Sequence, residues 1–588
     1  MNALNPESRK KVPKWKKILT EHKLIVVGGL IGAIALAGII SGIVILTEET
    51  DEKRDTFIFS LDGGLESIDP LNVYYADWNS RVLTQIVEPL FTLEWSGDHY
   101  ENVPYLAKNY EWSEDGLNLT CHLRKGIKFH DGSPFNATAI KWNFDRIHRL
   151  LDDMDIPYYG YPFIWYHADD TLILNKTIVL DDHIVRFVLN KPYVPFIALL
   201  TTIAAHIVSP TSTPADRFLN TLNEKLIGTG PYIYESNIPN ENTTIVANHN
   251  YWGKPKPKIE KFVFLYMDWA SDDSITNNSK RILSGESDYA WGLINHFENY
   301  SRDQSLIVTS YANVNIEYLG MNNIGINVTM RKAISYALNY TYIAEKRIST
   351  TGTNVTRLKS PISKGLLYSN WTAFDIPIYN ISKARQSLID GNWPGTASLS
   401  ANDNITFGNE WEMLANGPNP LAKYNISYIF GLTGSGWYLS NLTLIVKENI
   451  KQIGVNVEII PRTRDDYYAN CTSDTLWWSR YWWPDYNDPA TNINALFSSK
   501  NDGFANDQHT NDTYVQQWMD EALIETDEMV RKELYYKIQE RLIEEVYPMA
   551  WLFSTIQYDV WKSDSRGWEN LGNWMNKISG VLKYFYFV

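Results

Sequence analysis

Cysteine is scarce in this sequence. Only two cysteines, Cys121 and Cys471, occur in 588 residues, and they lie far apart. Neither has a companion at the spacing of metal ligands, so neither a zinc cluster nor a framework of disulfides is expected. Two buried thiols are the simplest interpretation, and one long-range disulfide stays open for a protein outside the cell.

Basic charge is also in short supply. The chain has 53 Lys and Arg against 68 Asp and Glu, a net charge of −15. Nucleic-acid binding depends on a clustered excess of basic charge, so nucleic acid is excluded as a partner. The sequence further lacks the P-loop pattern, H-E-x-x-H, G-x-S-x-G and histidines at metal-ligand spacing. We therefore expect no ATP hydrolysis, no enzymatic activity, no cofactor and no bound metal.

One long apolar run lies near the start of the chain. Residues 24–46 carry no charge, and at about 1.5 Å per residue they can cross a hydrocarbon core about 30 Å thick. The run exceeds the apolar core of a cleaved signal peptide, and no cleavage motif follows it. Lysine and arginine precede it and acidic residues follow it, which places the first residues in the cytoplasm. We expect a cytoplasmic tail (1–23), a transmembrane anchor (24–46), a linker (47–55) and an extracellular part, in a single-pass protein of the cell membrane.

Glycosylation sequons support an extracellular location. Asn-x-Ser/Thr occurs 16 times, always after the apolar run, and a glycan requires a translocated, exposed asparagine. Chance in an asparagine-rich chain is the alternative, and Asn136 precedes a helical pattern that it could cap instead. The density of sequons favours an archaeal surface protein. The candidate sites are Asn118, Asn175, Asn242, Asn354, Asn404 and Asn511.

Hydrophobic periodicity predicts α/β lobes. Residues 56–61 are expected to form a buried strand before the turn at Gly63-Gly64. A strand is also expected after Gly454, with alternating apolar residues from Val455. The chain is too long for one ordinary domain, so two or three lobes are expected. Helices are predicted from Asn136 and over 329–347, 440–453 and 529–546.

Short motifs follow one another in a fixed order along the chain. They are Ile68-Asp69-Pro70, Val87-Glu88-Pro89-Leu90, Pro104-Tyr105-Leu106-Ala107, Leu123 to Gly132, Pro134 to Ala137, Gly228-Thr229-Gly230-Pro231-Tyr232, Tyr251-Trp252-Gly253, Gly285-Glu286-Ser287-Asp288, Arg331 to Asn339, and Trp482-Trp483-Pro484-Asp485-Tyr486-Asn487-Asp488-Pro489. This ordered set resembles the family 5 extracellular solute-binding proteins, which bind oligopeptides, dipeptides or nickel. The resemblance covers nearly all of the expected extracellular part.

Two of these motifs are interpreted as turns. The stretch Gly228 to Tyr232 cannot cradle a phosphate, because Pro231 removes a backbone donor. His130-Asp131-Gly132 could suggest catalysis, but in this context it reads as a structural turn.

The resemblance implies a two-lobed α/β fold of the periplasmic-binding-protein kind (type II, cluster C) with an inserted subdomain. On this basis 56–310 form lobe I with its inserted subdomain, 311–550 form lobe II, and 551–588 return to lobe I. It also implies partners, namely the permease and ATPase subunits of an ABC importer.

The ligand site is expected in the last motif. In peptide-binding members the aspartate at the position of Asp485 pairs with the ligand's α-ammonium group, and a closed cleft strengthens such a pair. Trp482, Trp483 and Tyr486 are candidates for the cleft wall. The alternatives are a loop-capping role for Asp485 and plain packing between the lobes for the aromatic residues.

The ligand class stays open between several candidates. Aromatic residues are abundant here, and some relatives bind oligosaccharides, on which aromatic rings stack. Pro484 occupies a position where small residues are usual, which affects the expected amine geometry. Chelated nickel and a surface receptor that senses ligand without transport are further alternatives. Peptide capture for import is the favoured function.

Overall fold

The computed structural model describes residues 54–61, 63–65, 67–73, 77–153, 164–167, 169–266, 274–291, 300–403, 409–430, 436–470, 473–478, 482–502, 505–567 and 582–588. Arg54–Val588 form one compact unit, separate from Met1–Lys53. The predicted transmembrane segment 24–46, Asn404 and Cys471 lie outside the described residues. Within those residues, the helices are all too short or too polar to cross a membrane.

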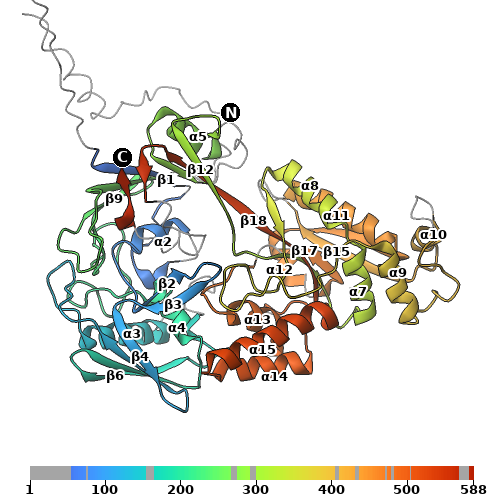
Figure 1. The fold of residues 1–588 in the computed structure, drawn as a ribbon, viewed down its shortest axis with the longest axis horizontal. Coiled ribbons are helices and arrows are strands. Elements are labelled where there is room, and N and C mark those ends of the chain that lie inside the picture. Colours follow the sequence, from blue (N-terminus) through green and yellow to red (C-terminus); the bar gives the residue numbers. More distant parts are fainter. Residues whose placement is uncertain are drawn as a thin grey trace, which may run out of the picture. The chain divides into compact units, whose positions relative to one another are not determined.

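A large mixed sheet runs through the described unit (Figure 1). Its strands follow the order β16-β15-β17-β13-β18-β11-β1-β10-β9-β8, and β12 and β14 also pair with β18. The strands are β1 (Thr56–Leu61), β8 (Tyr232–Ile238), β9 (Asn242–Ala247), β10 (Lys261–Tyr266), β11 (Tyr289–Trp291), β12 (Leu306–Ala312), β13 (Glu317–Met321), β14 (Val355–Arg357), β15 (Ala422–Ile429), β16 (Val455–Arg462), β17 (Leu476–Trp478) and β18 (Met549–Lys562).

The long strand β18 connects the two parts of this sheet. Its first half pairs with β13 and β14, and its second half pairs with β11 and β12. Side chains continue the hydrogen bonding where the chain passes from β12 to β13: Asn313 Nδ2 donates to Thr555 Oγ1 at 2.8 Å, and Thr555 Oγ1 donates to Asn315 Oδ1 at 2.9 Å. Beyond β18, Phe585 returns to the core around β1, where its ring lies 5.4 Å from that of Phe57. The end of the chain therefore contacts its beginning in two ways, through the pairing of β18 with β11 beside β1 and through the packing of Phe585 on Phe57.

A second, antiparallel sheet forms an inserted subdomain with its own core. It has the order β4 (Ala107–Trp112), β5 (Asn118–Leu123), β7 (Ile184–Leu189) and β6 (Leu174–Asp181), and α3 (Ala137–Asp153) packs on it. The predicted helix from Asn136 is confirmed, since Ala139 N donates to Asn136 Oδ1 at 2.9 Å and Ile140 and Phe144 are buried. Cys121 in β5 is a buried free thiol, as expected. The hairpin of β2 (Phe91–Trp95) and β3 (Tyr100–Pro104) lies beside this sheet.

The other predicted elements are confirmed with one correction. Strand β1 and the unit of α11 (Gly436–Lys451), Gly454 and β16 form as expected, and Gly454 has a φ of +78°. The single helix predicted over 329–347 is wrong: α7 (Val328–Ala337) ends at Leu338, whose ψ is 124°, and α8 (Tyr340–Thr351) starts anew. Asn339 causes the break, because its side chain accepts from Tyr342 N at 3.1 Å and so begins a second helix.

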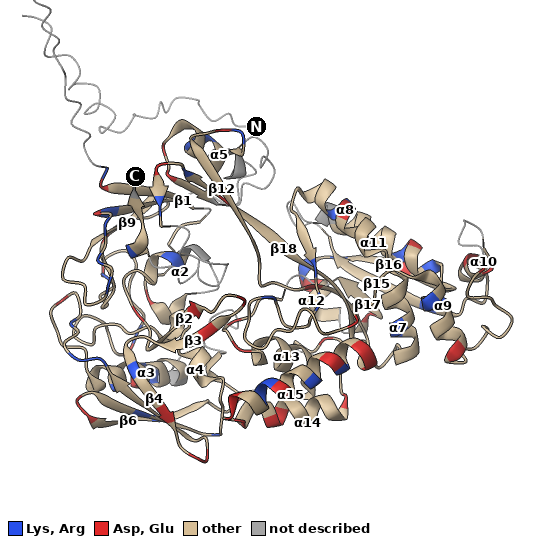
Figure 2. Cartoon of the chain, viewed as in Figure 1, with Lys and Arg blue, Asp and Glu red and all other residues tan. Residues whose placement is uncertain are grey.

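The helix predicted over 529–546 is α15 (Glu528–Arg541), which continues into a π-helical turn, Leu542–Val546. Acidic and basic residues are interspersed along α15 (Figure 2). The remaining helices and short strands are α2 (Asp77–Leu83), α4 (Phe196–Leu199), α5 (Ser274–Ser284), α9 (Ile381–Asp390), α10 (Glu410–Asn416), α12 (Arg464–Asn470), α13 (Ala490–Phe497), α14 (Thr513–Ile524), β19 (Ser565–Arg566) and β20 (Tyr586–Phe587).

Several sequence motifs converge on one buried carboxylate. Glu88 Oε1 accepts from the Tyr105 and Tyr251 hydroxyls at 3.1 and 2.6 Å, and Oε2 accepts from Thr229 Oγ1 and Trp252 Nε1 at 2.7 Å each. Burial raises the pKa of Glu88, although these hydrogen bonds and Lys583 oppose the rise. These motifs are therefore structural.

The two motifs interpreted as turns are turns. Gly230 N donates to Ile86 O at 2.9 Å, and a Cβ on Gly230 would overlap the neighbouring backbone, which explains the glycine there. In the other motif, Gly132 N donates to Phe129 O at 2.9 Å. The Asp131 carboxylate accepts from surrounding hydroxyls, among them Ser209 Oγ at 2.5 Å.

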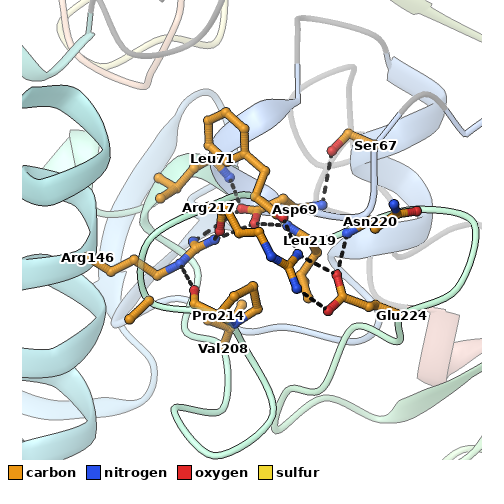
Figure 3. A network of polar contacts seen from close by, with 12 residues as sticks. Ser67, Asp69, Leu71, Arg146, Val208, Pro214, Arg217, Leu219, Asn220 and Glu224 are labelled. Carbon is orange, nitrogen blue, oxygen red and sulfur yellow. Dashed lines mark hydrogen bonds and ion pairs between the residues drawn. The ribbon is translucent and has the colours of Figure 1, made fainter. Parts of the chain in front are cut away.

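Another motif aspartate forms a buried ion pair (Figure 3). Arg146 Nη2 lies 2.5 Å from Asp69 Oδ2, and both side chains are almost fully buried. Asp69 Oδ2 also accepts from Leu219 N at 2.9 Å, while Arg146 donates to Pro214 O at 2.8 Å. The pair thereby fixes the segment 214–219 against α3.

Candidate functional site

The predicted ligand segment, 482–489, lies between β17 and α13. Trp482 and Ile316 exchange two backbone hydrogen bonds of 2.9 Å each. The indole Nε1 of Trp482 donates to Thr491 O at 2.9 Å. Trp482 and Trp483 are partly buried against the core around α13 to α15. The start of the segment is therefore attached to the part of the sheet around β13.

Asp485 is partly exposed between buried neighbours. Its backbone N donates to Thr491 Oγ1 at 2.8 Å, and that hydroxyl lies 3.4 Å from Asp485 Oδ2. Thr491 therefore contacts Asp485 at both its backbone N–H and its carboxylate.

Tyr486 contacts the inserted subdomain, and Asn487 contacts the hairpin of β2 and β3 beside it. The Tyr486 hydroxyl shares a hydrogen bond of 2.8 Å with the Tyr193 hydroxyl, and burial raises the pKa of Tyr486. Asn487 Nδ2 donates to Tyr100 O at 2.8 Å, and Asn102 Nδ2 donates to Asn487 O at 3.0 Å. Tyr486 and Asn487 therefore join the ligand segment to parts of the fold that are distant in sequence.

Asp488 forms a buried ion pair that sequence reasoning did not find. Arg531 Nη1 and Nη2 lie 2.7 and 2.8 Å from its two carboxylate oxygens, and both side chains are 3% exposed. Burial lowers the pKa of Arg531, but the pairing with Asp488 outweighs it and raises the pKa. Arg531 Nε donates to Ala522 O at 2.8 Å, and Ala490 N donates to Asp488 Oδ1 at 2.9 Å. The pair joins the ligand segment to α14 and α15.

The four predicted residues share one segment, so their proximity follows from the sequence. Tyr193, the partner of Tyr486, and Arg531, the partner of the neighbouring Asp488, come from distant parts of the chain and have no motif that would have identified them. Within the described ranges, no group of three or more His, Cys, Asp or Glu side chains is placed to hold a metal ion.

The glycosylation candidates differ in accessibility. Asn175 and Asn511 are exposed, whereas Asn118, Asn242 and Asn354 are partly buried. The Asn354 amide also donates to the Tyr558 hydroxyl.

Comparison with known proteins gives a consistent answer. Heme-binding protein A of Haemophilus influenzae is 25% identical over 512 residues, which are 84% of this chain and 86% of that protein. HbpA2 of Haemophilus parasuis has a TM-score of 0.72 at 22% identity, over 87% of this chain and 96% of that one. DppA of Helicobacter pylori, a periplasmic binding protein associated with an ABC transporter and solved with the peptide STSA, has a TM-score of 0.64 at 21% identity, over 91% and 98%.

These structures share a two-lobed periplasmic-binding-protein fold of mixed α/β content. The family model of the bacterial extracellular solute-binding proteins, family 5 middle, matches residues 101–504, more than half of the chain. Members of this family are solute-binding subunits of ABC importers rather than enzymes. The chain therefore belongs to family 5 of the extracellular solute-binding proteins.

Proposed function

We propose that this protein captures peptides and delivers them to the permease of an ABC importer. The observation that carries the proposal is the placement of Asp485, a partly exposed residue among the buried residues Pro484, Tyr486 and Asn487. Such a carboxylate can accept hydrogen bonds from a peptide's α-ammonium group. A related fold, DppA of Helicobacter pylori, was solved with a peptide.

The ion pair would supply a large share of the affinity. Removing one partner of a desolvated pair costs about 3–5 kcal/mol. Each 1.4 kcal/mol is about a factor of ten in the dissociation constant, so Asp485→Ala should weaken peptide binding by roughly a hundredfold or more.

Oligosaccharide binding is the second candidate, and the burial of tryptophans weighs against it. Trp477 and Trp478 are 1% and 2% exposed, so they are core residues and offer no face for a sugar. Trp482 and Trp483 are partly exposed in the same region. Stacking on a sugar would depend on these two indoles, whereas peptide capture requires Asp485.

The test is ligand-induced thermal stabilisation of the full chain in detergent. The ligands are di- to decapeptides, including Ser-Thr-Ser-Ala, and a matched set of oligosaccharides. A ligand at 100 times its dissociation constant stabilises the folded state by about 2.7 kcal/mol. We expect peptides to raise the melting temperature of the wild type and of Asp216→Ala, an exposed control, but not of Asp485→Ala. A shift with oligosaccharides alone would replace peptide by sugar as the ligand.

We further propose that residues 24–46 anchor the protein in the cell membrane, with the rest outside and glycosylated. The uncharged run of residues 24–46, flanked by basic and acidic residues, supports the anchor. The exposure of Asn175 and Asn511 supports glycan attachment at these two sequons. A variant without residues 1–46 should leave the membrane fraction, whereas the full chain should sediment with it.

A further inference from the structure

The second half of the ligand segment is attached at two points, to the inserted subdomain and to the hairpin of β2 and β3 beside it. One is the hydrogen bond of 2.8 Å between the hydroxyls of Tyr486 and Tyr193. The other is Asn487, which donates to Tyr100 O and accepts from Asn102 Nδ2. These partners belong to separate elements, since Tyr193 precedes α4 whereas Tyr100 and Asn102 lie in β3.

The loop that carries Tyr193 is itself fixed. The ring of Tyr193 packs edge-on against His167, with 5.1 Å between the ring centroids. The next residue, Val194, donates its backbone N–H to Leu523 O in α14 at 2.8 Å. Tyr193 and Tyr486 are 9% and 8% exposed, so their hydrogen bond is shielded from water. A shielded bond between two fixed side chains can set a position, because neither partner moves freely.

Asp485 lies at the boundary between the two attachments. Before it, Trp482 is bonded to Ile316 of the chain entering β13, and after it, Tyr486 is bonded to the inserted subdomain. The position of its carboxylate therefore depends on both parts of the fold. A substitution at Tyr193 alters one of the two attachments without changing the chemical structure of Asp485 itself.

We propose that Tyr193 is a positioning residue for ligand capture: through Tyr486 it holds the Asp485 carboxylate where it meets the ligand's ammonium group. The part of this inference that concerns the ligand rests on the proposed peptide-binding function. The structural link between Tyr193 and the ligand segment does not depend on that function. The inserted subdomain thus contributes to affinity without touching the ammonium group.

The first experiment needs no ligand. Hydrogen–deuterium exchange is measured on the full chain in detergent, in fragments that cover residues 482–491, for the wild type, Tyr193→Phe, Tyr486→Phe and the double variant. Tyr300→Phe is the matched control, since Tyr300 is 1% exposed and its hydroxyl bonds only within its own region, to Ser279. We expect both single variants to exchange faster in this segment. The double variant should exchange no faster than either, because all three lose the same bond.

The second experiment asks whether the effect passes through the ammonium group. The probes are Ser-Thr-Ser-Ala and its N-acetylated form, with binding measured by calorimetry. The loss of one hydrogen bond of about 0.5–1.5 kcal/mol predicts a dissociation constant about twofold to twelvefold higher for the free peptide with Tyr193→Phe. For the acetylated peptide the two proteins should bind equally weakly, a pattern that mere loss of stability would not give.

Each outcome decides the proposal. Unchanged exchange at 482–491 in Tyr193→Phe, or additive effects in the double variant, would overturn the link between Tyr193 and the segment. Equal losses for free and acetylated peptide would overturn the role through Asp485. If the wild type binds no peptide, the proposed function fails, and the exchange data alone then decide whether Tyr193 positions the segment.

Discussion

Replacing Arg531 by methionine removes the cation of a buried ion pair and keeps most of the apolar stem. Asp488 then stays 2% exposed beside α13 without its bidentate partner. An uncompensated buried charge costs about 3–5 kcal/mol, and the lost bond from Arg531 Nε to Ala522 O adds about 1 kcal/mol. For domains of 150–250 residues each kcal/mol lowers the melting temperature by roughly 2–4 °C. We therefore expect a decrease of about 8–24 °C for the transition that contains α15.

Differential scanning calorimetry measures this decrease directly. Lys537→Met is the matched control, because Lys537 is exposed on the same helix and surface substitutions stay within about 0.5 kcal/mol. Combining Arg531→Met with Asp488→Asn should recover part of the loss, since the second change removes the stranded charge. A decrease no larger than that of the control, or a double variant that is simply additive, would refute the idea that the pair is a coupled buried unit.

Three further predictions concern other described residues. Glu88→Ala should cost about 3–5 kcal/mol of unfolding free energy, because it removes the acceptor of four donors that are buried or partly buried. Burial raises the pKa of Glu88, so its contribution to stability is greatest below the unfolded pKa of 4.5 and declines as pH rises through the folded pKa. In urea titrations, the difference in stability between wild type and Glu88→Gln should therefore narrow with rising pH. Burial lowers the pKa of His206 to about 4, so the folded protein favours the neutral imidazole. The free energy of unfolding should therefore decrease by about 3 kcal/mol as pH falls from 6.5 towards 4. Urea unfolding at pH 7 and 4.5 should show this loss in the wild type and in His249→Gln, an exposed control, but not in His206→Phe; equal pH dependence in all three would contradict it. Glycopeptide mass spectrometry of the protein from its native membrane should find a glycan at exposed Asn511 and none at Asn425, whose amide donates to Asp474 at 2.7 Å; the reverse would contradict the role of exposure.

Local sequence predicted the elements whose signals are local. The cap at Asn136, the apolar face of α3 and the Gly454 turn all depend on residues within a few positions, and all are present. The break at Asn339 was missed because the apolar period runs through Leu338, whereas the competing cap is a single side-chain hydrogen bond. An apolar period alone does not predict whether a helix continues or whether a side-chain cap starts a new one.

Only the continuous segment of the candidate site could be predicted from the sequence, because its partners depend on long-range packing. The segment around Asp485 is one continuous motif, so its residues could be named from the sequence. Its partners, Tyr193 and Arg531, are a tyrosine and an arginine without any motif of their own. They become partners only when the inserted subdomain and α15 pack against the segment. Long-range packing, not local propensity, makes them part of the site.

The central position of β18 has a consequence for biosynthesis. Strands β11 and β13 lie on either side of it in the sheet, so each has an unpaired edge until residues 549–562 are available. Ribosomes make the chain from its N-terminus, and unpaired strand edges readily join other chains. The nascent protein should therefore stay vulnerable to aggregation until translation has passed β18. A pause or truncation just before residue 549 should trap it in an association-prone state.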